Sequence, residues 1–165
     1  MKIVVIAHNI RSILNLGAIF RTAEGLGVEQ IILSGYTPNF HSGLPHVRAK
    51  MQRELHKTAL GAEEMVASEY RDNIAETLAE LKRDGFRLVG LEQDDRAVML
   101  PDYTAPDKIA LLLGEEVAGI APDLRAVCDD LIEIPMHGQK ESFNVAVATG
   151  IALYGLSLPK STVKP

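Results

Sequence analysis

Arg21 and Asn15 are the first side chains that could take part in binding or catalysis. They lie in the segment NLGAIFRTAEGLG, residues 15–27. Arg21 lies in the middle of an apolar run, and a guanidinium placed there can bind a phosphate or act in catalysis. Spacing alone favours a plainer interpretation, in which a surface Arg21 pairs with Glu24 three residues later. Asn15 is a favoured helix N-cap. The sequence leaves both interpretations of Arg21 open.

A pair of carboxylates follows a buried strand in the segment LLLGEEVAGI, residues 111–120. Gly114 ends the strand, and a residue without Cβ lets a ligand approach the backbone closely. Glu115 and Glu116 come next, and their plain interpretation is a strand-to-helix turn with solvated acids. Because neither G-K-[ST] nor G-x-G-x-x-G is present, a phosphate loop and a dinucleotide fingerprint are excluded.

The third segment with polar residues in an apolar setting is IEIPMHGQKESFNVAVATGIALY, residues 132–154. A strand, a proline and a loop lead into an apolar helix. Ser142 is predicted as the N-cap of that helix. Capping explains Ser142 fully but leaves Asn144, at the start of the same helix, less well explained.

Short apolar runs alternate with helical patterns along the chain, and they must position these residues. Strands are predicted over Lys2–Ala7, Gln30–Leu33, Arg87–Leu91, Ile109–Leu113 and Leu131–Ile134. Helices are predicted over Asn15–Leu26, Val47–Thr58, Asn73–Arg83, Pro122–Val127 and Ser142–Leu156. This alternation predicts an α/β fold with a mostly parallel sheet flanked by helices. We expect one domain over residues 1–158 and a short tail over 159–165.

The same pattern indicates where a site would lie. Ligands of such folds bind at the carboxyl ends of the strands. Three strands are followed at once by unusual sequence, over residues 92–95, 114–119 and 135–142. We therefore expect a functional site built from these three segments.

The composition excludes several classes of protein. The single cysteine, Cys128, excludes an intramolecular disulfide, and no Cys/His cluster offers four zinc ligands. The apolar run at the N-terminus stops at His8, too short for a signal peptide or a membrane span, so we expect a cytoplasmic protein. The net charge of −5 argues weakly against a nucleic-acid partner. Yet residues 44–60 are basic and 61–84 acidic, as in two solvated helix faces or in a basic edge facing RNA.

Together and in this order, the three segments resemble the three motifs of the SpoU/TrmH branch of the SPOUT methyltransferases. The family's first motif has the form N-x-G-A-I-x-R-T-A, and residues 15–23 read NLGAIFRTA. Its next motif is a strand ending in G-x-E-x-x-G-[LI], and residues 114–120 read GEEVAGI. Its last motif is I-P-M-x-G followed by S-[LF]-N-V, and residues 134–145 read IPMHGQKESFNV. The resemblance spans nearly the whole chain and implies an S-adenosylmethionine-dependent RNA 2′-O-ribose methyltransferase.

The resemblance also implies an architecture: a SPOUT-type domain with a C-terminal trefoil knot, a rare exception to ordinary chain topology. It implies a homodimer in which Arg21 of one subunit faces the cofactor of the other, and it implies no metal. Asn15 would orient the site, Glu116 would support the loop or the substrate, and Ser142 and Asn144 would shape the target pocket. By similarity, the cofactor-binding residues are Leu91, Glu92, Gly114, Ile134, Met136, Ser142 and Phe143.

Arg21 could act in catalysis in one of two ways. The family's favoured general base is this arginine, but a guanidinium has a pKa above about 12 and is hard to deprotonate. Binding the adjacent phosphate and stabilising the developing alkoxide is physically easier.

The substrate and the rival functions rest on the same resemblance. Members that act on ribosomal RNA often add an N-terminal substrate-binding domain, and because this chain shows none, we expect tRNA, with rRNA as the alternative. A non-catalytic knotted module that holds RNA or cofactor is the main rival, and a methyltransferase acting on a base nitrogen is another. The retained motif residues oppose the first rival, and the S-F-N-V form of the third motif opposes the other.

Overall fold

The computed structural model describes residues 1–158 and contains a seven-stranded sheet in which all paired strands run parallel. The order is β3-β2-β1-β6-β4-β7-β5. The strands are β1 (Lys2–His8), β2 (Gln30–Ser34), β3 (Ala67–Arg71), β4 (Arg87–Leu91), β5 (Val98–Met99), β6 (Lys108–Leu113) and β7 (Asp130–Glu133). The predicted α/β class with a parallel sheet is confirmed, and the predicted tail over 159–165 lies outside the described residues.

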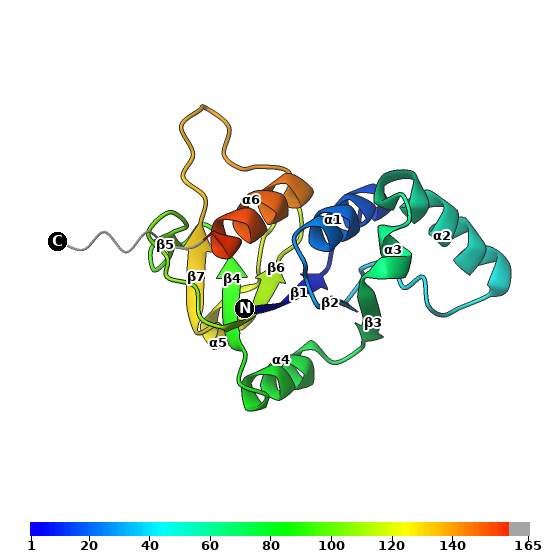
Figure 1. Cartoon of the computed structure of the whole chain (residues 1–165), viewed down its shortest axis with the longest axis horizontal. Coiled ribbons are helices and arrows are strands. Elements are labelled where there is room, and N and C mark those ends of the chain that lie inside the picture. Colours follow the sequence, from blue (N-terminus) through cyan, green and yellow to red (C-terminus); the bar gives the residue numbers. More distant parts are fainter. Residues whose placement is uncertain (159–165) are drawn as a thin grey trace.

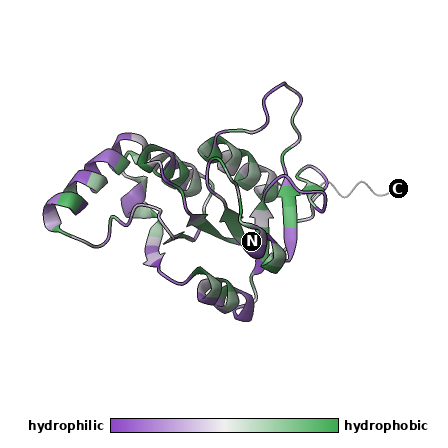
Figure 2. Ribbon diagram, turned by 180° about the vertical axis from the view of Figure 1, so that it is seen from behind, coloured by the Kyte–Doolittle hydropathy of each residue, from purple (hydrophilic) through white to green (hydrophobic). Residues whose placement is uncertain are grey.

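Helices cover both faces of the sheet (Figure 1). One face carries α1 (Ile13–Gly25), α2 (Pro45–Ala59), α3 (Ala62–Met65) and α6 (Val145–Ser157), and the other carries α4 (Ile74–Arg83) and α5 (Pro122–Val127). The central strands β1 and β6 are buried along almost their whole length. Figure 2 shows the central strands of the sheet in green, the colour of hydrophobic residues.

Two hydrophobic clusters hold the layers together. The larger one joins the sheet to α1, α6 and their neighbours and includes Phe20, Leu55 and Leu153. The smaller one joins the opposite face to α4 and α5 through Leu78 and Leu124. Each fully buried large apolar side chain contributes about 1.5–3 kcal/mol, so the sheet is a firm base for the loops at its carboxyl edge.

All five predicted strands and all five predicted helices are present; β4 and α5 have the predicted bounds, and the other eight have shifted ends. Three short elements were not predicted: α3, β3 and β5. The two strands lie at the edges of the sheet, and neither has a fully buried residue. An edge strand needs no continuous apolar run, so the sequence pattern gives no signal for it.

The predicted N-caps of α1 and α6 were wrong. Ser12 caps α1, and its hydroxyl accepts a hydrogen bond from the backbone N–H of Asn15. Asn144 caps α6 through the N–H groups of Ala146 and Val147, whereas Ser142 lies before the helix. Asn15 is therefore inside the first turn of α1, where its side chain is free to contact other segments.

Candidate functional site

A cavity of about 310 Å³ opens at the carboxyl ends of β4, β6 and β7, beside the start of α6. Cavities of this size and place in parallel sheets bind small molecules. Its apolar walls include Leu113, Val145 and Ala148. All seven residues predicted for the cofactor line this cavity: Leu91, Glu92, Gly114, Ile134, Met136, Ser142 and Phe143.

Two glycines shape the loop that follows β6. The backbones of Glu115 and Gly119 hydrogen bond to each other, N to O, at 3.1 and 3.0 Å, so the loop closes on itself. A Cβ at Gly114 would lie 2.1 Å from the carbonyl carbon of Gly119. Gly119 has φ +69°, a left-handed conformation that favours glycine. The close packing of the loop thus requires glycine at position 114, and Gly114 also lines the cavity.

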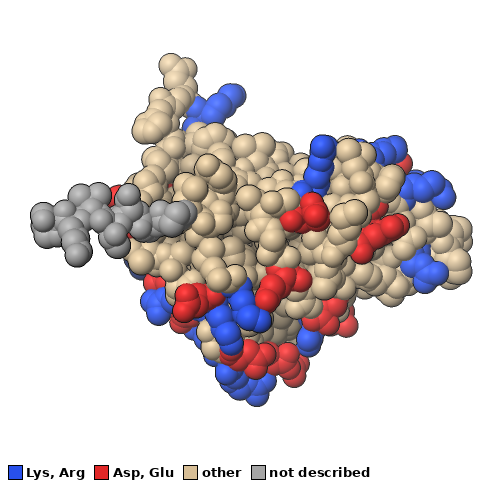
Figure 3. Space-filling view, in the orientation of Figure 1, with Lys and Arg blue, Asp and Glu red and all other residues tan. Residues whose placement is uncertain are grey.

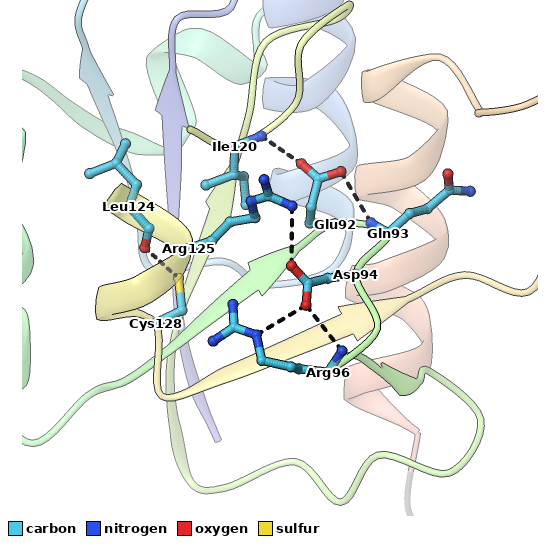
Figure 4. A network of polar contacts seen from close by, with 8 residues as sticks. All are labelled: Glu92, Gln93, Asp94, Arg96, Ile120, Leu124, Arg125 and Cys128. Carbon is cyan, nitrogen blue, oxygen red and sulfur yellow. Dashed lines mark hydrogen bonds and ion pairs between the residues drawn. The ribbon is translucent and has the colours of Figure 1, made fainter. Parts of the chain in front are cut away.

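Glu92 holds this loop in place (Figure 4). Its carboxylate accepts hydrogen bonds from the backbone N–H of Ile120 at 2.5 Å and of Gln93 at 3.1 Å. A Cβ on Gly119 would meet the same carboxylate at 2.1 Å. Glu92 is therefore a wall of the cavity whose carboxylate already has backbone partners, which makes it a positioning residue.

The segment after β4 is also tied to α5 (Figure 4). Asp94 forms ion pairs with Arg96 at 3.0 Å and with Arg125 at 3.1 Å. The hydrogen bonds from Arg96 hold the pKa of the Asp94 carboxyl below its usual range. Burial raises the pKa of the nearby Cys128 thiol to about 11, which favours the protonated thiol at neutral pH.

Glu116 joins the loop after β6 to the start of α1. Its carboxylate accepts hydrogen bonds from the backbone N–H groups of Arg11 at 3.3 Å and Ser12 at 3.2 Å, and from the Asn15 amide at 3.3 Å. Burial opposes ionisation of this carboxyl, but the hydrogen bonds outweigh it and hold its pKa below the usual range. Glu116 is therefore an anion that binds two segments together.

The contact continues from Asn15 to Asn144. The Asn144 Nδ2 donates to Asn15 Oδ1 at 3.1 Å, while the Asn144 Oδ1 accepts from the N-terminal turn of α6. Each amide oxygen is thus bound to a donor and each amide nitrogen to an acceptor, which fixes the orientation of both side chains. Glu116, Asn15 and Asn144, predicted separately from three motifs, form one chain of hydrogen bonds across three elements.

Ser142 and Phe143 lie in the long loop between β7 and α6, and both are exposed at the edge of the cavity. Ser142 has no role in capping, so its hydroxyl is available at the opening. Phe143 is 40% exposed, a large apolar area for an aromatic ring beside a pocket. Both residues are placed to contact a ligand that enters from solvent.

Arg21 lies apart from this group. It is exposed, does not line the cavity, and makes no ion pair with Glu24 or any other residue within 1–158. It stands six residues beyond Asn15 on α1, about 9 Å along the axis and on another side of the helix. The surface pair with Glu24 is therefore wrong, and within one chain Arg21 is separate from the other four predicted catalytic residues.

Sequence reasoning missed a further set of contacts around the loop after β6. Tyr36 donates a hydrogen bond to Glu115, and Arg11 forms an ion pair with Glu115 at 3.5 Å. The Arg11 guanidinium also lies 5.1 Å from the centre of the Tyr36 ring. Since Arg11 and Tyr36 follow β1 and β2, the rule that strand ends meet at one edge could have found them.

Metal-binding clusters and membrane-spanning helices are both absent from residues 1–158. No group of three or more His, Cys, Asp or Glu side chains in this part of the chain could hold a metal ion. No helix there is long and apolar enough to cross a membrane.

The profile of the SpoU rRNA Methylase family matches residues 2–154. The chain is 35% identical over 141 residues to a 23S rRNA (guanosine-2′-O-)-methyltransferase of Acinetobacter baylyi, covering 85% of this chain and 53% of that protein. It is 33% identical over 154 residues to a tRNA (guanosine(18)-2′-O)-methyltransferase of Aquifex aeolicus, covering 92% and 67%. The chain thus spans about half the length of several curated relatives that it matches.

Solved structures agree with the sequence matches. An AdoMet-bound rRNA methyltransferase from Sinorhizobium meliloti aligns with a TM-score of 0.80 and 25% identity, over 94% of this chain and 55% of that one. A structure described as giving insights into the 2-OH methylation of C/U34 on tRNA aligns with a TM-score of 0.76 and 26% identity. That match covers 94% of this chain and 93% of the other.

Proposed function

The chain belongs to the SpoU rRNA methylase family, and we propose that it transfers a methyl group from S-adenosylmethionine to a ribose 2′-hydroxyl in RNA. The observation that carries this proposal is the joining of Asn15, Glu116 and Asn144 into one hydrogen-bond chain beside the cavity. A polar network of this kind, next to a pocket that opens to solvent, is what a site for positioning a substrate requires.

The residues of the cavity fit S-adenosylmethionine. Leu91, Ile134 and Met136 give apolar walls for an adenine ring, and the backbone at the ends of β4, β6 and β7 can read its polar edge. Glu115, Glu133 and Glu141 also line the cavity and give it a negative character that suits a cation. When bound, the cofactor supplies an electrophilic methyl group on a positive sulfonium.

The chain's own task is to align the ribose hydroxyl with that methyl group. Fixing two reactants in line can lower the barrier by roughly 7–11 kcal/mol. The anchored chain of Glu116, Asn15 and Asn144 would set the position of α1 and α6 around the cavity. Ser142, exposed at the opening, would contact the target nucleotide.

We propose that the working unit is a homodimer. The helices α1 and α6 pack side by side (Figure 1), and both carry exposed or half-buried apolar side chains. We name these side chains together the α1/α6 face; its members are Leu14, Ala18, Val147, Ile151 and Tyr154. Val147 is 51% exposed and Tyr154 58%. Large apolar side chains left half exposed on two neighbouring helices are typical of a protein interface.

The proposed dimer also gives Arg21 a role. It stands on the exposed side of α1 together with Leu14 and Ala18. In a two-fold dimer formed through the α1/α6 face, Arg21 of one chain would approach the cavity of the other. There it would bind the phosphate next to the target ribose and stabilise the developing alkoxide. Its guanidinium has no ion-pair partner within residues 1–158, so it is ready for such a contact.

tRNA is the substrate that we favour. The tRNA-related structure matches this chain over 93% of its own length, whereas the 23S rRNA relative is matched over 53%. rRNA remains the alternative because the family includes relatives of that activity. We also propose the trefoil knot for the C-terminal segment, since β7 is inserted between β4 and β5 in the sheet, and a cytoplasmic location, in keeping with the unpaired Cys128.

The test is transfer of labelled methyl from S-adenosylmethionine to bulk unmodified tRNA and, in parallel, to rRNA, followed by digestion to nucleosides. We expect a 2′-O-methylated nucleoside from tRNA. A methylated base would contradict ribose chemistry. Cofactor binding without transfer to either RNA would contradict the enzyme and favour a non-catalytic module.

A further inference from the structure

One side of α2 carries a row of basic side chains, three cations and a histidine. His46, Lys50, Arg53 and Lys57 are spaced four, three and four residues apart, so they lie on one face of the helix. All four are exposed. We name these residues the α2 basic stripe. Figure 3 shows Lys and Arg side chains gathered over α2, at the right-hand end of the molecule.

The charge of this stripe is poorly compensated. Lys57 pairs with Glu54 at 2.7 Å, but Lys50 and Arg53 form no ion pair with any residue of 1–158. Elsewhere the cations are mostly paired: Lys2, Arg11, Arg71, Lys82, Arg83, Arg87, Arg96 and Arg125 each have a carboxylate within 4 Å. Three of the Lys and Arg residues of 1–158 that have no ion pair therefore lie on α2, namely Arg48, Lys50 and Arg53; the others, Arg21, Lys108 and Lys140, lie on three separate segments.

The helix is built to stay exposed. Only Leu55 and Ala59, both near its end, are buried, and nothing in its first half is. The buried end is fixed on α1: Thr58 Oγ1 donates to the carbonyl of Leu14 at 2.9 Å, and a Cβ on Gly17 would meet Thr58 at 2.2 Å. The C-terminal end of α2 is therefore anchored on the half of α1 that carries Asn15, and the stripe extends away from this anchor.

We propose that the α2 basic stripe binds the phosphate backbone of the RNA substrate, outside the target nucleotide. This inference rests on the proposed function and adds a separate contact surface to it. Phosphate contacts orient a nucleic acid without reading its sequence. They also supply affinity that an acidic protein lacks on average, since affinity follows local charge. A row of three cations and a histidine along one helix fits a phosphate backbone better than a compact ligand.

The experiment compares the wild-type chain with the double variant Lys50→Ala/Arg53→Ala. The RNA is one unmodified tRNA transcript, and its dissociation constant is measured over a series of salt concentrations. We expect the affinity to fall about tenfold and the slope of log K against log salt to decrease by about two. Because both side chains are exposed and unpaired, the fold, the S-adenosylmethionine affinity and the oligomeric state should not change.

The matched control is Arg83→Ala on α4, which removes one exposed cation from the other face of the sheet. Its RNA affinity should equal that of the wild type. If the double variant keeps wild-type affinity and slope while the wild type methylates RNA, the inference is overturned and the proposed function stands. A wild type that neither binds nor methylates RNA overturns both. An affinity loss with an unchanged slope also contradicts phosphate binding.

Discussion

The cavity at the carboxyl edge of the sheet and the α1/α6 face differ in how completely one chain builds them. Around the cavity, two of the lining carboxylates are anchored within the chain: Glu92 binds Ile120, and Glu116 binds Asn15 and two backbone N–H groups. On the α1/α6 face, Arg21 has no ion-pair partner within residues 1–158 and Tyr154 is more than half exposed. We infer that the first region is complete within one subunit and that the other region is completed by a partner subunit.

The largest effect should come from Arg21→Ala. If Arg21 stabilises charge in the transition state, its loss should lower methyl transfer by about 10²–10³-fold, the cost of removing one such donor. The cavity lies elsewhere, so S-adenosylmethionine binding measured by calorimetry should stay within about twofold. Equal losses of methyl transfer and of cofactor affinity would show that Arg21 contributes to the cavity. The cavity and the α1/α6 face would then not be separate regions.

Breaking the α1/α6 face should have the next largest effect. Tyr154→Asp places a charge in an apolar interface, and desolvation of that charge should dissociate the dimer. We expect a monomer in analytical ultracentrifugation, at least about tenfold less methyl transfer, and retained cofactor binding. The control Val127→Asp adds the same charge at a residue of α5 that is 45% exposed. A Tyr154→Asp chain that remains dimeric would show that the interface lies elsewhere.

A smaller loss of stability and activity is expected from a substitution beside the cavity. Glu116→Gln keeps the size of the side chain but turns an amide N–H towards donors. One of the N–H groups of Arg11, Ser12 or Asn15 then loses its acceptor, at a cost of about 1–3 kcal/mol. We expect a lower melting temperature and roughly tenfold slower transfer. Glu64→Gln on the exposed side of α3 is the control, and equal melting temperatures for the two variants would show that Glu116 binds nothing of consequence.

The smallest expected effect is a loss of folding stability at acidic pH. Because the folded pKa of Glu116 is held below its usual range, its contribution to stability is complete above the unfolded value of about 4.3. That contribution is lost as the pH falls through the folded pKa. The difference in unfolding free energy between wild type and Glu116→Gln, from urea titrations, should therefore shrink below about pH 4. A difference that grows in acid would contradict a stabilised carboxylate.

The sequence was informative where local pattern decides structure. β1 and β6 were predicted because strands buried on both faces are apolar throughout. The motif residues Asn15, Glu116 and Asn144 were identified by resemblance. Their contact was not, since Asn15 and Glu116 are 101 residues apart.

The errors have a common origin in tertiary contacts. Ser12 and Asn15 are both good caps, and the Asn15 side chain instead makes tertiary hydrogen bonds with Glu116 and Asn144. Arg21 and Glu24 have the spacing of an ion pair, but on this helix they do not form one. Edge strands such as β3 carry no periodic signal because neither face is fully buried.

The most direct test of the two-chain site is complementation between two inactive chains. Arg21→Ala keeps the cavity, while Ala148→Phe fills the cavity and keeps Arg21; each should be inactive alone. After subunit exchange in an equal mixture, half of the dimers are mixed, and each mixed dimer has one intact site. The account predicts about a quarter of wild-type methyl transfer. A mixture as inactive as its components, with exchange verified by mass spectrometry, would mean that Arg21 acts within its own chain.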